Sequence, residues 1–140
     1  MHYLDTSVLT GYYCIEERSE RVQRALSAMD TPTISPLVEL EFYCAVARKV
    51  RAEALDKGMA VRIFSEFQMH LAEPRYCVLP IDTSHYVLAR EWLAELVTPL
   101  RVLDALHLAA ASSAGLYIVT ADRDLARCAE HFGVECKLIS

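Results

Sequence analysis

The sequence predicts an α/β fold in which a mostly parallel sheet of short strands is covered by helices on both faces. Two observations support this. Short apolar runs, typical of buried strands, occur at residues 3–4, 33–34, 77–79, 116–119 and 137–139. The gaps between these runs hold longer stretches with helical spacing of apolar residues. Because short apolar strands alternating with helices are typical of parallel sheets, we expect about five strands in a single domain covering residues 1–140.

The expected helices follow from apolar periodicity and from start and stop signals. Ser35 precedes Pro36, the favoured order of N-cap and first helical residue, so one helix should run from there to about Arg51. Gly133 follows the last expected helix and suits a C-terminal cap. The other expected helices cover residues 16–29, 54–71 (or two helices with a break near Gly58), 84–96, 103–114 and 121–131.

Composition and charge narrow the class of protein. The 140 residues are 54% hydrophobic and 24% charged, which indicates a globular chain. No apolar run approaches the roughly 20 residues that a membrane span requires, and the first residues already resemble a strand rather than a signal peptide. The formal net charge of −5 gives no global attraction for nucleic acid, so such a substrate would need a local basic patch or a bound metal. The five cysteines include no Cys-x-x-Cys pair, which favours reduced thiols in the cytoplasm.

Four acidic residues stand where an isolated carboxylate is unexpected. Asp5 and Asp122 each follow an apolar run, at the ends of the first and fourth expected strands. Glu41 and Asp104 lie within apolar helical segments, where burial of a lone acid is costly. Open α/β sheets bind ligands outside the carboxyl ends of their strands, so we expect these acids to converge there.

Each acid also has a simpler interpretation. Asp5 and Asp122 could cap the helices that follow them. Asp104 would interact favourably with the dipole at the start of its own helix. Glu41 could pair with Arg48, although two helical turns is a long separation for such a pair. Asp82 is best explained as a helix cap.

Neighbouring acids compete for two of these positions. At about 100° per residue, Glu39 points away from the side of the helix that carries Glu41, so the helical phase favours Glu41. Asp124 follows Asp122 closely and could serve in its place. The sequence leaves that second choice open.

A group of carboxylates would need a cation. Carboxylates held together raise one another's pKa unless a positive charge neutralises them. Ligation by oxygen alone suits a hard ion, Mg²⁺ or Mn²⁺, rather than zinc. Such an ion can activate a water molecule and stabilise charge on a phosphate, so the acid set suits phosphodiester hydrolysis.

Other residues carry weaker signals. His107 is better explained as a hydrogen-bonded core histidine than as a ligand, and Phe42 as a core residue. Arg101 and Arg123 flank two of the acids. A mid-chain group of cations could contact phosphate or form a solvated helix face, and it consists of Arg48, Lys49, Arg51, Lys57 and Arg62.

The segments that carry the acids resemble those of the PIN-domain family, and specifically VapC-type toxins. The matching segments are YLDTSVL at 3–9, SPLVELE at 35–41, LRVLDALHLA at 100–109 and VTADRDL at 119–125. They occur in family order over nearly the whole chain. The resemblance implies a PIN-like α/β/α sandwich and an Mg²⁺- or Mn²⁺-dependent endoribonuclease that acts as the toxin of a type II toxin–antitoxin pair. It further implies a cognate VapB-like antitoxin that blocks the site, often with an Arg among the acids, and commonly a homodimer.

By that resemblance the metal-binding and catalytic set is Asp5, Glu41, Asp104 and Asp122. Hydroxyls of Thr6, Ser7 or Thr120 would then hydrogen-bond to the ligating carboxylates or their waters. Two alternatives remain open. One is a housekeeping PIN-type RNA-processing nuclease, and the other is a non-catalytic RNA- or protein-binding module on the same fold. An aspartyl-phosphate hydrolase is disfavoured, because it needs a second Asp where this chain has Ser7.

Overall fold

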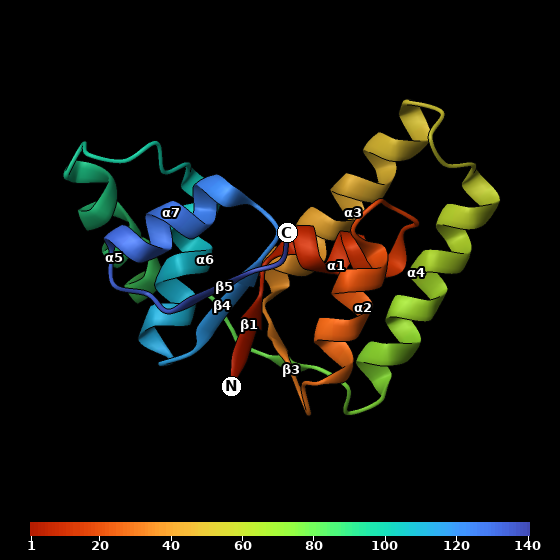
Figure 1. Ribbon diagram of the computed structural model, residues 1–140, viewed down its shortest axis with the longest axis horizontal. Coiled ribbons are helices and arrows are strands. Elements are labelled where there is room, and N and C mark those ends of the chain that lie inside the picture. The colour runs from red at the N-terminus through yellow and green to blue at the C-terminus, as the bar shows by residue number, and fades with distance from the viewer.

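A five-stranded parallel sheet lies between two groups of helices in the computed structural model, which describes residues 1–140 (Figure 1). The strands are β1 (His2–Leu4), β2 (Thr33–Ile34), β3 (Cys77–Val78), β4 (Tyr117–Thr120) and β5 (Cys136–Leu138). The helices are α1 (Thr6–Tyr13), α2 (Ser19–Ser27), α3 (Pro36–Arg51), α4 (Lys57–Ala72), α5 (Thr83–Ala94), α6 (Val102–Ser113) and α7 (Arg123–His131). Helices α1 to α4 lie on one side of the sheet and α5 to α7 on the other. The predicted α/β/α sandwich is therefore confirmed.

The strand order is β3-β2-β1-β4-β5, and every neighbouring pair is parallel. All strand bounds lie within one residue of those expected from the sequence. The central pairing aligns Leu4 of β1 with Val119 of β4. Because the two strands run in the same direction, Asp5 after β1 and Asp122 after β4 leave the sheet at the same edge.

Side-chain caps set the starts of helices α3 and α4. The Val38 N–H donates to Ser35 Oγ at the start of α3, as expected. Helix α4 begins at Lys57 and not at residue 54 as predicted, because Asp56 accepts the Met59 N–H and caps the helix there. The helix then continues through Gly58 without a break. Gly133 has a φ of +70° just after α7, the left-handed conformation that favours glycine at a C-terminal cap.

The stretch 16–29 forms a shorter helix than predicted. Helix α2 begins only at Ser19, whose hydroxyl accepts the Glu16 N–H and donates to the Cys14 carbonyl, both at 2.8 Å. These two hydrogen bonds hold residues 14–18 in a turn between α1 and α2. A side chain that bonds its local backbone in this way competes with helix formation.

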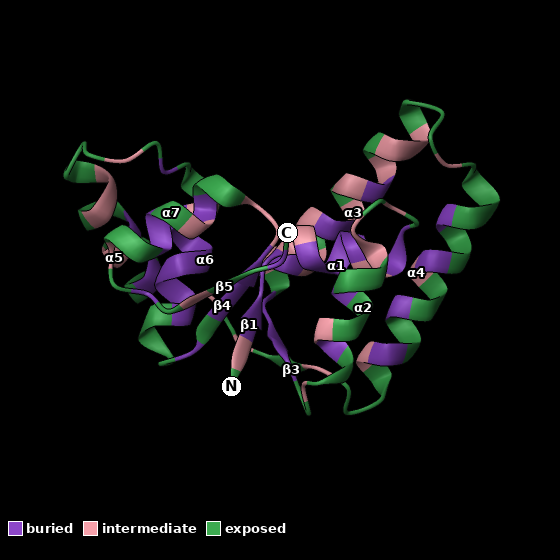
Figure 2. Ribbon diagram, in the orientation of Figure 1, coloured by how far each residue is buried: buried purple, intermediate pink, exposed green.

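Packing fixes the short strands in place. The strands form few ladder bonds, but 31 buried hydrophobic residues make up the core, and the buried positions gather where the helices face the sheet (Figure 2). Phe42 is fully buried, as expected. Helix α6 buries every residue from Ala105 to Ala111. Each fully buried large aliphatic side chain contributes roughly 1.5–3 kcal/mol to the stability of the fold. Helix α6 therefore holds Asp104, in its first turn, in a fixed position.

None of the helices is long and apolar enough to cross a membrane. All five cysteines are free thiols, as their spacing suggested.

Candidate active site

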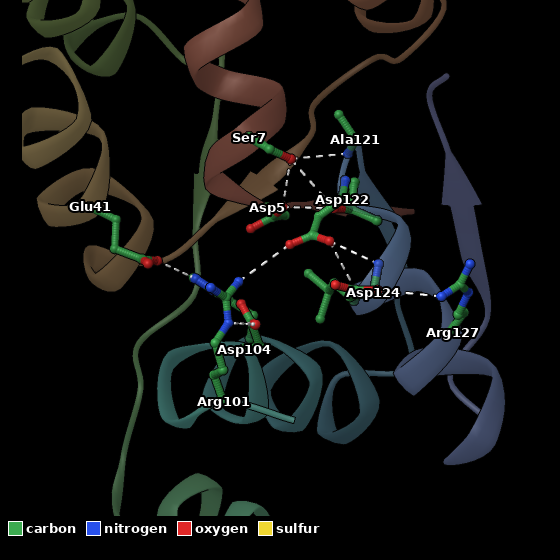
Figure 3. Close-up of polar contacts among 12 residues, drawn as sticks. Asp5, Ser7, Glu41, Arg101, Asp104, Ala121, Asp122, Asp124 and Arg127 are labelled. Atoms are coloured by element: carbon green, nitrogen blue, oxygen red, sulfur yellow. Dashed lines mark hydrogen bonds and ion pairs between the residues drawn. The ribbon is translucent and has the colours of Figure 1, made fainter. Parts of the chain in front are cut away.

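The four acids singled out by the sequence line one pocket at the carboxyl edge of the sheet. Its volume is about 270 Å³, and Asp5, Glu41, Asp104 and Asp122 all contribute to its wall. They come from four separate places, namely the end of β1, helix α3, the first turn of α6 and the start of α7, and they surround a common space (Figure 3). Larger hollows of about 640 and 790 Å³ lie elsewhere on the surface and contain none of these acids.

Asp5 is held by two hydroxyl groups rather than acting as a cap. It stands at the N-cap position of α1, yet its side chain makes no capping hydrogen bond, so the simpler interpretation of Asp5 is wrong. Its Oδ2 accepts from Ser7 Oγ at 2.6 Å and from Thr120 Oγ1 at 2.7 Å. The Ser7 hydroxyl in turn accepts the Ala121 N–H at 3.0 Å, which ties the ends of β1 and β4 together. The hydrogen bonds expected from Ser7 and Thr120 are therefore present.

Glu41 is bound from two sides. Its Oε1 accepts from Thr6 Oγ1 at 2.9 Å and also hydrogen-bonds His107 Nε2. Burial tends to raise the pKa of this carboxyl, but the hydrogen bonds from His107 and Thr6 and the nearby Arg48 guanidinium outweigh it and hold the pKa below its ordinary value. Glu41 forms no ion pair with Arg48, so that alternative is wrong. Glu39 lies outside the pocket, in agreement with the helical phase.

Asp104 is the acid most in need of a positive charge. Burial and the negative charge of Asp5 raise its pKa, and Arg101 only partly offsets that rise. The Arg101 Nε donates to Asp104 Oδ2 at 3.0 Å. A carboxylate with a raised pKa in a pocket of like charges is stabilised by any cation that enters.

Asp122 caps a helix and faces the pocket as well. Its Oδ1 accepts the N–H groups of Asp124 and Leu125 at 2.8 and 3.3 Å, and its Oδ2 faces the Arg101 guanidinium at 3.4 Å. Asp124 is exposed, pairs with Arg127 and does not line the pocket. The structure thus brings Asp122, and not Asp124, to the other acids.

Arg101 occupies a position that the sequence did not reveal. Its guanidinium lies between Asp104 and Asp122 and pairs with both (Figure 3). The sequence showed only that it flanks an acid. The one available signal was the spacing of three residues to Asp104, which brings the N-cap residue of α6 near an acid in its first turn.

The oxygen donors of the four acids suit a hard cation, although their side chains are not close enough together to coordinate an ion as they stand. No group of three or more His, Cys, Asp or Glu side chains is close enough to coordinate an ion. The hydrogen bonds described above use Asp5 Oδ2, Glu41 Oε1 and Asp104 Oδ2, and they leave the second oxygen of each carboxylate for a ligand. Free carboxylate oxygens without nitrogen or sulfur donors suit Mg²⁺ or Mn²⁺.

A row of buried polar side chains behind the pocket was also not predicted from the sequence. Tyr3, Ser35 and His107 are fully buried and hydrogen-bond in series to Glu41. His107 is therefore a hydrogen-bonded core histidine, as expected, but its partner is one of the four acids. Nothing in the spacing of residues 3, 35 and 107 pointed to this contact, because it depends on the packing of α6 against β1.

Comparison with known proteins identifies the family. Residues 2–131 match the family model of the PIN domain, and the chain belongs to that family. No curated protein sequence matches the chain with statistical significance.

Solved structures that share the fold include the following three. VapC20 of Mycobacterium tuberculosis, described as a Sarcin-Ricin loop cleaving toxin, gives a TM-score of 0.74 at 18% identity, over 91% of this chain and 94% of that one. VapBC2 of Rickettsia felis, bound to a DNA fragment from its promoter, gives 0.75 at 16% identity over 100% of both chains. FitAcB of Neisseria gonorrhoeae gives 0.72 at 21% identity, over 97% and 96%. At these identities the likeness establishes the fold.

Proposed function

We propose that this protein is a metal-dependent endoribonuclease, the toxin of a type II, VapBC-like toxin–antitoxin pair, which hydrolyses RNA phosphodiester bonds. The main support is the convergence of four carboxylates from separate elements on one pocket at the carboxyl edge of the sheet. Membership of the PIN family and the shared fold with VapC20 add to it.

In this proposal Asp5, Glu41, Asp104 and Asp122 hold Mg²⁺ or Mn²⁺. The ion would supply an activated water molecule and stabilise charge on the phosphate. Ser7 and Thr120 orient the Asp5 carboxylate, and Thr6 orients that of Glu41. Arg48, which also lines the pocket, is placed to contact a phosphate of the substrate.

The partners are proposed on the same basis. A VapB-like antitoxin would cover the acid pocket, since VapBC2 and other proteins of this fold are toxin–antitoxin complexes. A homodimer of one-domain subunits is the expected assembly. The free thiols are in keeping with a reducing cytoplasm.

The decisive experiment is cleavage of purified total RNA by the antitoxin-free protein. We expect discrete cuts in Mg²⁺, none in EDTA, and none with Asp104→Asn in Mg²⁺. The matched control is Asp124→Asn, which removes a carboxylate of the same type outside the pocket and should cut like the wild type. Cleavage by folded Asp104→Asn at the wild-type rate would refute the proposal.

A second matched pair tests the assignment on α3. Glu41→Gln should abolish cleavage, whereas Glu39→Gln, two residues earlier on the same helix, should retain it. Both variants keep the size of the side chain, so circular dichroism should show the same helix content in each. If neither wild type nor Glu39→Gln cuts RNA while both bind Mn²⁺, the binding-module alternative gains support.

A further inference from the structure

A continuous row of hydrogen bonds runs through the core and ends at Glu41. Ser35 Oγ lies 2.7 Å from Tyr3 Oη, and Tyr3 Oη lies 2.7 Å from His107 Nδ1. The other ring nitrogen of His107, Nε2, bonds Glu41 Oε1. Ser35, Tyr3 and His107 are fully buried and come from three different elements, the start of α3, strand β1 and helix α6.

With a neutral His107 ring, the donors and acceptors of this row are satisfied in one direction. A carboxylate accepts hydrogen bonds and does not donate, so His107 Nε2 must carry a proton. With a neutral ring, Nδ1 then accepts the Tyr3 hydroxyl proton, and the Tyr3 oxygen accepts the Ser35 proton. The Ser35 oxygen accepts the Val38 N–H at the start of α3. Every group donates once and accepts once, and no buried side-chain polar atom lacks a partner.

Glu41 has a particular need for such support. Glutamate has one more rotatable bond than aspartate, so its carboxylate loses more rotamer freedom when it is held in one position. Asp5 directly follows β1 and Asp122 lies two residues after the end of β4, and both side chains are short. Glu41 instead reaches the pocket from the second turn of α3. A bond from a rigid, fully buried ring therefore restricts Glu41 Oε1, while the hydrogen bonds of this carboxylate leave Oε2 free.

We propose that the Ser35–Tyr3–His107 row is a positioning device that fixes the Glu41 carboxylate for metal binding, with His107 held in the Nε2–H tautomer by Tyr3. This inference rests on the proposed function. Tyr3 and His107 are positioning residues, because they act through Glu41. Outer hydrogen bonds of this kind orient ligands in metal sites generally.

The first test is Mn²⁺ affinity measured by calorimetry, without any assay of activity. Tyr3→Phe removes one oxygen and should weaken binding about 3- to 10-fold, because a net hydrogen bond of roughly 1 kcal/mol corresponds to about fivefold in affinity. The matched control is Tyr13→Phe, which removes another buried Tyr–His hydrogen bond, to His70 Nδ1 at 2.6 Å, between two residues that do not line the acid pocket. Tyr13→Phe should lower stability in urea and leave Mn²⁺ affinity unchanged.

Two substitutions of His107 separate positioning from packing. The amide nitrogen of Gln reaches roughly as far as Nε2, so His107→Gln should keep affinity within about twofold. The amide of Asn reaches only as far as Nδ1, so His107→Asn should bind as weakly as Tyr3→Phe or more so. In the His107→Gln background, adding Tyr3→Phe should have little further effect, because the amide donor does not depend on Tyr3.

The second test is the tautomer of His107, read from its ring nitrogen shifts by ¹⁵N NMR of the metal-free protein. We expect Nε2–H in the wild type and a mixture in Tyr3→Phe. An Nδ1–H ring in the wild type overturns the inference. Equal Mn²⁺ affinity in wild type and Tyr3→Phe also overturns it. If the wild type binds no Mn²⁺, the proposed function is contradicted. The tautomer test then decides the direction of the row.

Discussion

Thr120 donates its hydroxyl proton to Asp5 Oδ2 at 2.7 Å across 115 positions of the sequence. The same hydroxyl oxygen accepts the Asp122 N–H at 3.0 Å. One side chain at the end of β4 thus joins two of the four acids. It also supplies a hydrogen-bond donor to Asp5, which is only 6% exposed.

Replacement of Thr120 by Val should therefore destabilise the protein. The change keeps the shape of the side chain but deprives Asp5 of one donor and the Asp122 N–H of its acceptor. We expect a loss of about 1–3 kcal/mol in the free energy of unfolding, measured by urea denaturation. Thr33→Val is the matched control, a buried threonine in β2 whose hydroxyl makes no hydrogen bond to another side chain, and it should change stability much less. Equal losses in both variants would contradict the role assigned to Thr120.

Asp104→Asn should stabilise the metal-free protein at neutral pH. The folded state raises the pKa of Asp104 above its value of about 3.9 in the unfolded chain, so the ionised form is disfavoured by folding. This destabilisation is present at neutral pH and disappears as pH falls through the folded pKa, when the folded protein takes up a proton.

The measurement is urea denaturation in EDTA at pH 7.5 and at pH 4. The midpoint of Asp104→Asn should exceed that of wild type at pH 7.5, and the difference should shrink at pH 4. Asp124→Asn, at an exposed position, should show no such pattern. A lower midpoint for Asp104→Asn at pH 7.5 would show that its ion pair with Arg101 outweighs the cost of burial.

Arg101→Ala should tighten the binding of Mn²⁺. The guanidinium of Arg101 pairs with Asp104 and Asp122, so it competes with an incoming cation for the same carboxylates. Its side chain is 73% exposed, and exposed ion pairs are weak, so the gain should be only a few-fold. Calorimetry would measure it, with Arg127→Ala, which removes an arginine paired only with Asp124, as the control. Weaker binding by Arg101→Ala would instead mean that Arg101 holds the acids in place.

Stability should fall in mild acid because of His70. This side chain is buried, hydrogen-bonds Tyr13 Oη and lies 3.2 Å from Arg75 Nη1. Burial and the Arg75 charge lower its pKa below the value of about 6.5 in the unfolded chain. The unfolded state therefore takes up a proton first as pH falls below about 6.5, and stability is lost until the folded pKa is reached.

The urea midpoints at pH 7.5 and pH 5.5 would show this loss. His70→Gln should be less stable than wild type at pH 7.5 but should lose less on acidification. His131→Gln removes an exposed histidine, and its stability should fall on acidification as much as that of the wild type. An equal loss in all three proteins would rule out His70 as the cause.

The sequence predicted the parts of this fold that depend on local pattern. Strand positions followed from short apolar runs, and the start of α3 from Ser35 and Pro36. The four acids could be selected because strand ends and apolar helices are unusual places for a carboxylate. The start of α2 was misjudged because the Ser19 hydroxyl bonds the local backbone, a choice that apolar spacing does not record.

The remaining features depend on which distant segments meet. Asp122 could not be preferred over Asp124 until the exit angle of α7 from β4 was known. The contacts of Arg101 with Asp122 and of Tyr3 with His107 join residues far apart in the chain, and no spacing rule reaches them. Metal binding and the catalytic roles of the four acids stay predictions.

The order of the strands also sets when the acid pocket can exist. Strand β4 lies between β1 and β5, so it completes the centre of the sheet, yet it is among the last elements in the chain. During synthesis the ribosome releases Asp5 and Glu41 long before Asp104 and Asp122. A growing chain therefore carries no more than two of the four acids until residue 104 has been added. An unfinished or prematurely ended product has no assembled pocket, so the activity proposed for this protein would begin only after β4 has joined the sheet.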